Sequence, residues 1–252
     1  MPRPDPTARL RSAGCVFAEE EAALLLAHTA DDAELERLVR AREAGAPLEQ
    51  LLGWAEFDTL RIRLEPGVFV PRQRSLLLVE EAARLAPPGA TVLDLCCGSG
   101  ALLAAVLRRR PDVVPLAADL DPAAVTAARR NLPPDAVHEG DLFAALPDAA
   151  RGRVDVVLLN APYVPTERIA DLPPEARDHE HRLALDGGAD GLAVHRRVLA
   201  EAGAWLAPGA IVLTEVATHQ LATIADLAVH RGWRATPIVD EERRATVVRM
   251  ER

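Results

Sequence analysis

The first part of the chain shows the spacing of apolar residues that is typical of helices. Between residues 8 and about 52, apolar side chains recur every three to four positions. The acids Asp31 and Asp32 open one of these runs, and acids favour a helix N-terminus. The Gly45-Ala46-Pro47 stretch predicts where that helix ends.

Short extended runs follow between Trp54 and Pro71. They read AEFDTLRIRL and GVFVP and are separated by Pro66-Gly67, a pair that favours turns. The pattern predicts a small hairpin, with its turn at Pro66-Gly67, that joins two parts of the chain.

From Leu76 onward the pattern changes again. A helix is predicted over 76–84 and ends at the Pro87-Pro88-Gly89 break, after which apolar strands alternate with amphipathic helices. The predicted strands are TVLDL, VVPLAAD, VDVVLLN and AIVLTEV, with a closing pair of strands at RATPIVD and ATVVRM. Such alternation is typical of a parallel, doubly wound α/β sheet. We therefore expect a helical N-terminal domain over residues 1–75, including the hairpin as a linker, and a larger α/β domain over residues 76–252.

Composition and charge indicate which classes of partner are disfavoured. The net charge is −9 and only 3% of the residues are aromatic, which disfavours a nucleic-acid partner. The basic residues of one segment, Arg61, Arg63, Arg72 and Arg74, are interpreted as solvated charges of loops and strand edges. The tryptophans Trp54, Trp205 and Trp233 are interpreted as packing residues.

No apolar run reaches the roughly 18 residues of a membrane span, and the N-terminus has no apolar signal core. We therefore expect a protein of the cytoplasm without a membrane partner. The three cysteines, Cys15, Cys96 and Cys97, suit neither a disulfide framework nor a zinc site and are expected to be reduced thiols.

Glycines and acids gather where the first strands of the α/β part end. The first strand runs into Asp94-Leu95-Cys96-Cys97-Gly98-Ser99-Gly100, where free amides and close backbone approach are possible. The third glycine of the dinucleotide fingerprint would fall at Leu103 and is absent. Asp119 ends the second strand, and Asp141 follows VHEG. A pocket with these acids and little positive charge favours a cationic adenosyl ligand without phosphates, whereas ordinary tight turns are the alternative.

The motifs DLCCGSG, ADLDPAAV, GDLF and NAPY, in that order, resemble those of class I S-adenosylmethionine-dependent methyltransferases. More narrowly, nearly the whole chain resembles the protein-(glutamine-N(5)) methyltransferases that modify peptide chain release factors. The resemblance implies a Rossmann-like, seven-stranded doubly wound sheet and a release factor or another glutamine-bearing protein as substrate. It also implies S-adenosylmethionine as cofactor, bound by Asp94, Cys96, Gly98, Gly100, Asp119, Leu120, Asp141, Leu142 and Asn160.

The same resemblance implies that Asn160, Ala161, Pro162 and Tyr163 are catalytic. A carboxamide nitrogen is a poor nucleophile because its lone pair is delocalised into the carbonyl. If the Asn160 side-chain oxygen and the Ala161 carbonyl accept its two N–H hydrogens, the nitrogen faces the sulfonium methyl, and Tyr163 packs against the amide. This chemistry requires no metal. An Asn before Ala-Pro-Tyr is also compatible with a plain turn.

Two departures from the family leave the methyl acceptor open. Ala161 replaces the first proline of Asn-Pro-Pro-Tyr, and Gln73-Arg74-Ser75-Leu76 replaces an acidic, proline-containing run. A small-molecule amide or amine, the amino group of adenine in a nucleic acid, and a non-enzymatic adenosyl-binding module therefore remain as alternatives.

The segment Asp178-His179-Glu180-His181-Arg182 has His-x-His spacing but no clear further metal ligands. It is interpreted as a loop that covers the active site, ordered by Glu180 and Arg182.

Overall fold

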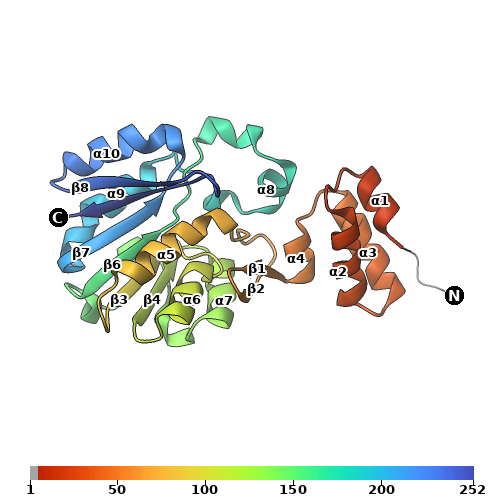
Figure 1. Ribbon diagram of the computed structural model, residues 1–252, viewed down its shortest axis with the longest axis horizontal. Helices are drawn as coiled ribbons and strands as arrows, with labels where there is room; N and C mark the ends of the chain where they lie inside the picture. The colour runs from red at the N-terminus through yellow and green to blue at the C-terminus, as the bar shows by residue number, and fades with distance from the viewer. Residues whose placement is uncertain (1–4) are drawn as a thin grey trace.

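The computed structural model describes residues 5–252, so the first four residues of the expected N-terminal domain lie outside it. Helices occupy the N-terminal part, as the apolar spacing predicts (Figure 1). They are α1 (Thr7–Ser12), α2 (Ala18–His28), α3 (Asp32–Glu43) and α4 (Leu48–Leu52). The side chain of Asp31 caps α3 by accepting a hydrogen bond from the Ala33 amide. These helices enclose a core of their own around Leu10, Leu25 and Leu38.

The hairpin exists, but its predicted turn was wrong. Strands β1 (Trp54–Phe57) and β2 (Leu60–Arg63) pair antiparallel around Asp58-Thr59, and Asp58 has a φ of 56°. Asp tolerates this left-handed conformation better than most residues, so the run AEFDTLRIRL folds back on itself. Phe57 and Ile62 are buried with α5 and α6 rather than with the N-terminal helices. The hairpin therefore packs as part of the α/β core.

The α/β part confirms the predicted doubly wound sheet. Seven strands lie in the order β5-β4-β3-β6-β7-β9-β8. The first five are parallel, and β9 pairs antiparallel with both β7 and β8. Their bounds are β3 (Thr91–Leu95), β4 (Val114–Asp119), β5 (Val137–Glu139), β6 (Val154–Leu159), β7 (Leu206–Glu215), β8 (Arg234–Asp240) and β9 (Ala245–Glu251). Pro237 lies in β8, an edge strand, where a missing amide is tolerated.

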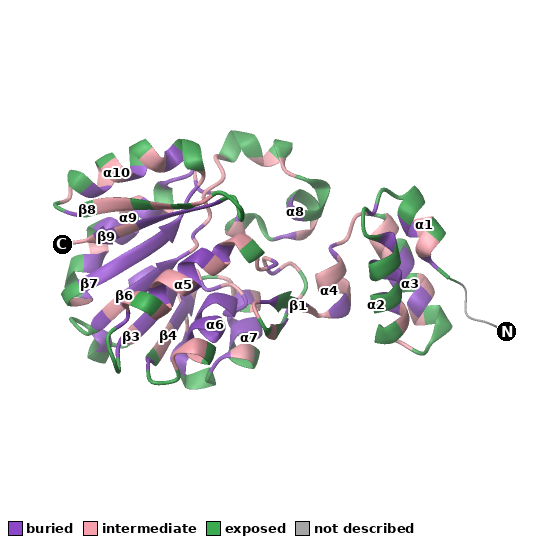
Figure 2. Ribbon diagram, viewed as in Figure 1, coloured by how far each residue is buried: buried purple, intermediate pink, exposed green. Residues whose placement is uncertain are grey.

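Helices cover both faces of this sheet (Figure 1). They are α5 (Leu76–Leu85), α6 (Ala101–Arg109), α7 (Pro122–Asn131), α9 (Ala193–Glu201) and α10 (Leu221–Val229), with the short α8 (Pro174–His179) between β6 and α9. Alternate residues of the strands enter two cores: Leu158 packs with α5 to α7, and Leu159 packs with α9 and α10. The central strands are therefore buried along most of their length (Figure 2).

Other expectations concern single residues. Trp205 and Trp233 are buried as packing residues, as expected. All three cysteines are free thiols, with Cys15 and Cys97 buried and Cys96 half-buried. Within residues 5–252, no helix combines the length and the apolar character that crossing a membrane requires.

The order of the strands fixes where a site can form. Strand β3 leads through α6 to β4 on one side, whereas its other neighbour, β6, pairs on its far side with β7. Connections that leave the carboxyl ends of β3 and β6 therefore diverge, and a crevice opens between them.

Candidate active site

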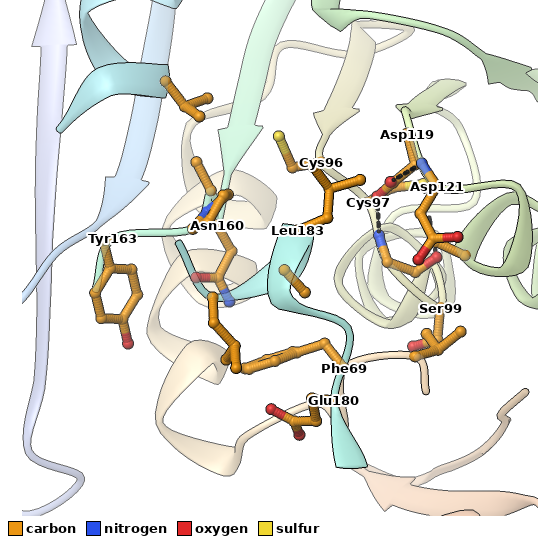
Figure 3. Close-up of a pocket in the computed structure, with 18 of the residues that line it drawn as sticks. Phe69, Cys96, Cys97, Ser99, Asp119, Asp121, Asn160, Tyr163, Glu180 and Leu183 are labelled. Atoms are coloured by element: carbon orange, nitrogen blue, oxygen red, sulfur yellow. Dashed lines mark hydrogen bonds between the residues drawn. The ribbon is translucent and has the colours of Figure 1, made fainter. Parts of the chain in front are cut away.

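A cavity of about 510 Å³ lies at the carboxyl ends of β3, β4 and β6. Its volume is within the range that holds a small ligand or cofactor. Figure 3 shows its two halves, with the Cys96–Ser99 loop, Asp119 and Asp121 on one side and Asn160 and Tyr163 on the other. One half is therefore formed by the predicted cofactor motifs, and the other by the predicted catalytic corner.

Most of the predicted site residues meet at the wall of this cavity. They are Cys96, Gly98, Asp119, Leu120, Asp141, Leu142, Asn160, Ala161, Pro162 and Tyr163. Asp94 and Gly100 are not on the wall. A Cβ on Gly100 would lie 2.7 Å from a methyl group of Leu132, and its φ is 76°, so this glycine serves the close packing at the start of α6.

The carboxylate of Asp119 organises the glycine loop. Its Oδ2 accepts a hydrogen bond of 2.8 Å from the Gly98 amide, and its Oδ1 accepts one of 2.9 Å from the Asp121 amide. Cys96, where the loop begins, has a φ of 58°, and such a left-handed conformation is uncommon for a residue with a side chain. A Cβ on Gly98 would meet no atom within 4 Å, so the backbone borders open space there. The loop therefore offers close backbone approach to a ligand.

Asp94 lies behind the loop with no exposed surface. Neither carboxyl oxygen has a hydrogen-bond partner among the residues that the structure describes. Burial raises the pKa of Asp94 to about 8 although the nearby Leu103 amide acts to lower it, and the Asp119 carboxylate adds to the rise. Asp94 is therefore largely protonated near neutral pH, and its place is beneath the loop.

Asp141 and Leu142 form the far end of the cofactor half. Arg197 of α9 donates two hydrogen bonds, of 3.0 and 2.8 Å, to the Asp141 carboxylate, which is half exposed. Leu142 has a φ of 49° and, after Cys96, is the second non-glycine residue on the wall with a left-handed backbone. Arg197 was not predicted from the sequence, because 56 positions separate it from Asp141.

Asn160 leaves β6 with its side chain oriented by Ser75. The Asn160 Nδ2 donates a hydrogen bond of 3.3 Å to the Ser75 Oγ, and Ser75 is only 1% exposed. This contact occupies the nitrogen end of the carboxamide and leaves Oδ1 as an acceptor. Ser75 was missed by the sequence analysis, in which it appeared only as part of a departure from the family.

Arg72 and Arg74 were interpreted as solvated charges from the sequence, and the structure contradicts this. The Arg72 Nη2 lies 2.7 Å from the Glu180 Oε1, and the Arg74 Nε lies 2.9 Å from the Glu215 Oε1. Both carboxylates are buried, so each needs a cationic partner. Of the other two arginines interpreted in this way, Arg61 stacks on Trp54, with 3.8 Å between the guanidinium carbon and the ring centroid, and Arg63 is exposed.

The expected covering segment, 178–182, begins with the last two residues of α8 rather than with a loop. Residues 178–184, called the covering loop below, place Glu180, Leu183 and Ala184 on the wall of the cavity and are tied down from several segments. Glu180 accepts hydrogen bonds from Arg72 and from the Val70 amide, as its expected ordering role requires. Arg182, also expected to order the loop, pairs with Asp186. The His181 amide donates to the Gly67 carbonyl at 2.8 Å.

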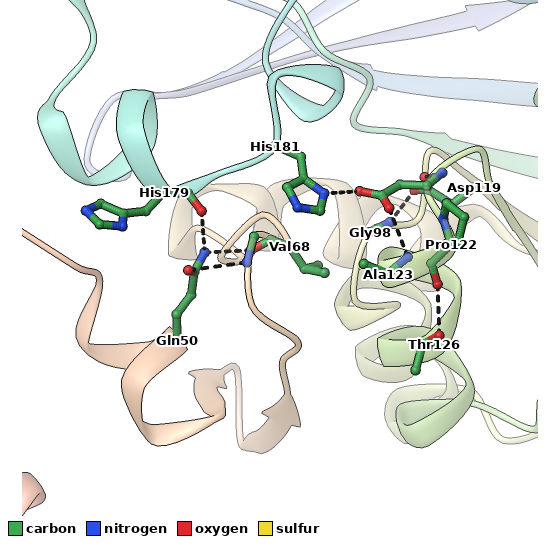
Figure 4. A network of polar contacts seen from close by, with 11 residues as sticks. Gln50, Val68, Gly98, Asp119, Pro122, Ala123, Thr126, His179 and His181 are labelled. Atoms are coloured by element: carbon green, nitrogen blue, oxygen red, sulfur yellow. Dashed lines mark hydrogen bonds and ion pairs between the residues drawn. The ribbon is translucent and has the colours of Figure 1, made fainter. Parts of the chain in front are cut away.

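Two further contacts complete this fastening (Figure 4). The Gln50 side chain donates to the carbonyls of Val68 and His179 at 3.1 and 3.2 Å. The His181 ring bonds to Asp121, which also caps α7. Gln50, the 67–72 segment and α7 therefore hold the covering loop together. Among residues 5–252, no cluster of three or more His, Cys, Asp or Glu side chains is arranged for a metal ion.

The protonated state of Asp94 predicts a pH dependence of stability. Its folded pKa of about 8 lies above the ordinary value of 3.8. The stabilisation that its bound proton gives to the folded state is therefore full at low pH, declines as the pH rises above 3.8, and is lost once the pH has passed through about 8. Asp94→Asn should remove a slope of about 1.4 kcal/mol per pH unit from the free energy of unfolding between about pH 5 and pH 8. Urea denaturation of both proteins measures this. Parallel pH profiles would contradict the assignment.

The covering loop yields a second prediction. A Cβ on Gly67, whose φ is +81°, would lie 2.1 Å from the His181 Nε2, so Gly67→Ala should displace His181 from Asp121. Gly89→Ala is the matched control, because Gly89 has a φ of +72° and a Cβ there meets nothing within 4 Å. Both variants carry the backbone strain, and hydrogen exchange should accelerate over 178–184 only in Gly67→Ala. Equal protection in the two variants would refute the fastening.

Comparisons with known proteins agree with this geometry. The family model described as methyltransferase small domain matches residues 59–172. A methyltransferase from Pyrococcus furiosus has a similar fold, with a TM-score of 0.57, 18% identity and coverage of 76% of this chain and 88% of that one.

Relatives of higher identity carry a more specific name. A release factor glutamine methyltransferase from Geobacter sulfurreducens is 36% identical over 200 residues, which are 78% of this chain and 69% of that protein. One from Mycolicibacterium smegmatis is 36% identical over 246 residues, which are 90% of this chain and 87% of that protein. On this similarity, with a methyltransferase fold around the predicted site, the chain belongs to the release factor glutamine methyltransferase family.

Proposed function

We propose that this protein transfers the methyl group of S-adenosylmethionine to the side-chain amide nitrogen of a glutamine in a peptide chain release factor. Membership of the family supports the reaction and the substrate. The observation that carries the proposal is the hydrogen bond from Asn160 to Ser75, because it leaves the Asn160 oxygen as an acceptor at the cavity wall. The activity is assigned to the cytoplasm, where release factors act.

The residues of the cofactor half fit an adenosyl group. The open space at Gly98 allows close approach, and the carboxylates of Asp119 and Asp141 provide acceptors beside it. We assign the ribose hydroxyls to Asp119 and the adenine end to Asp141 and Leu142, with Cys96 and Leu120 as wall residues. Asp94 and Gly100 support the loop from behind. When bound, the cofactor supplies an electrophilic methyl group on a sulfonium.

The catalytic corner then has a positioning task. The Asn160 Oδ1 and the Ala161 carbonyl accept the two N–H hydrogens of the acceptor amide and so hold its nitrogen toward the methyl group. Replacing proline by Ala161 retains that carbonyl, and Pro162 still restricts Ala161 to extended geometry. The nitrogen loses a proton after transfer, and an N-protonated amide is acidic enough that no strong base is required.

We assign recognition of the protein carrier to the N-terminal helices. They lie at one end of the molecule, beside α8 (Figure 1). Arg42 of α3 bonds to Glu175 of α8 at 2.7 Å, and Gln50 holds the covering loop. A carrier bound by these helices is therefore close to the acceptor half of the cavity.

The direct test is incubation with labelled cofactor, a release factor from cells that lack their own methyltransferase, total RNA, DNA and a small-molecule extract. Label should enter the release factor, and tandem mass spectrometry should place one methyl group on a glutamine side chain. Label found only in nucleic acid or in small molecules would overturn the proposed acceptor.

Asn160→Ala should lower turnover by at least about 100-fold, because the acceptor amide loses a positioning oxygen. Ser75→Ala should lower it by only about tenfold, the effect of one lost neutral hydrogen bond. Calorimetry should show that both variants still bind S-adenosylmethionine. Unchanged turnover of Asn160→Ala would contradict the role given to this residue.

A further inference from the structure

Arg74, Tyr163 and Glu215 form a three-way contact on the acceptor side. The Arg74 Nη2 donates to the Tyr163 hydroxyl at 2.6 Å, and the Arg74 Nε donates to the Glu215 Oε1 at 2.9 Å. The Tyr163 hydroxyl in turn donates to the same Oε1 at 3.3 Å. The three residues come from the turn before α5, from the corner after β6 and from the end of β7.

The charges explain why this contact is fixed. The Glu215 side chain is 3% exposed, and its Oε2 has no hydrogen-bond partner among the described residues. A buried carboxylate is costly unless a cation compensates it, and Arg74 is the cation in contact. Burial, followed by the Glu215 charge, raises the pKa of Tyr163 to about 12. The phenol therefore stays neutral and can donate to Glu215 while it accepts from Arg74.

The planar guanidinium of Arg74 also fixes the position of Tyr163 relative to Glu215. A guanidinium presents its N–H groups in one rigid plane, so bonds from Nε and Nη2 fix two partners relative to each other. The next residue, Ser75, holds Asn160. Both belong to the short 3₁₀ turn Gln73–Ser75 that leads into α5, and α5 is anchored in the core by Leu78 and Val79. The Gln73–Ser75 turn thus contacts the side chains of both Asn160 and Tyr163.

We propose that Arg74 is a positioning residue for methyl transfer: it holds the Tyr163 phenol so that the ring keeps its orientation beside the acceptor amide. This inference rests on the proposed function, which places the acceptor at Asn160 and Tyr163.

The chain offers a direct spectroscopic test, because Tyr163 is its only tyrosine. Tyrosine labelled with ¹³C at the ζ position gives one signal, which reports on the hydrogen bonds of this hydroxyl. Arg74→Lys keeps the positive charge near Glu215 but cannot reproduce the planar fork. The signal should shift, and turnover should fall by about tenfold, while calorimetric affinity for S-adenosylmethionine stays unchanged.

Arg72→Lys is the matched control. Arg72 lies two positions away, lines the same cavity and also pairs with a buried carboxylate, that of Glu180, but it does not touch Tyr163. Its substitution should leave the Tyr163 signal in place. Glu215→Gln is a second variant, which removes the buried charge and should lower the Tyr163 pKa from about 12 toward its ordinary value of 10. Absorbance titration of the tyrosinate measures that change.

Three results would overturn the proposal. They are an unshifted signal in Arg74→Lys, a shifted signal with unchanged turnover, and a loss of cofactor affinity that matches the loss of turnover. If Arg74→Lys does not fold, the double variant Arg74→Gln/Glu215→Gln removes both charges together, and the same three results apply to it. The Tyr163 signal is recorded without any methyl acceptor. If the release factor is not a substrate, the transfer assay contradicts the proposed function, and the Tyr163 signal still tests the contact with Arg74.

Discussion

The reversal of strand order between β3 and β6 is the constraint on which the rest of the structure depends. Parallel strands buried on both faces carry no functional side chain along their length, so chemistry is confined to the loops at their carboxyl ends. The connections that follow β3 and β6 diverge, and the cavity forms between them. The glycine loop leaves one of these strands and the Asn160 corner leaves the other. A cofactor half and an acceptor half therefore face each other because of topology.

Backbone groups give the cofactor half its rigidity. Asp119 belongs to β4, yet its carboxylate bonds to the amide of Gly98 in the neighbouring loop and to that of Asp121 after its own strand. This fixes two loops relative to each other before any ligand binds. Asp121 then reaches His181 of the covering loop. A chain of contacts thus runs from the floor of the cavity to its cover, and preorganisation of this kind lowers the entropy cost of binding.

The sequence predicted what local pattern determines and missed what depends on distant partners. Periodicity located most of the strands and helices but missed the short β5 and α8, and the motifs located ten wall residues. The turn of the hairpin was misplaced because Pro66-Gly67 has stronger turn chemistry than Asp58-Thr59, where tertiary burial of Phe57 decided the fold. Arg74 was taken for a solvated charge because Glu215 lies 141 positions away. Asp94 could be recognised as part of a motif, but its burial could not be read from the motif alone.

Buried acids around the cavity explain the role of the segment VPRQRS, residues 70–75, which supplies two arginines to them. Burying a carboxylate is costly, and the fold meets this cost at three sites in two different ways. Asp94 keeps its proton, whereas Glu180 and Glu215 each receive an arginine from this segment. Arg72 holds the covering loop above the cavity, and Arg74 holds the acceptor corner.

These arginines stand two positions apart on one short stretch of the chain. The covering loop and the catalytic corner therefore take their positive charges from the same few residues, and the fold places those residues by anchoring α5 in the core.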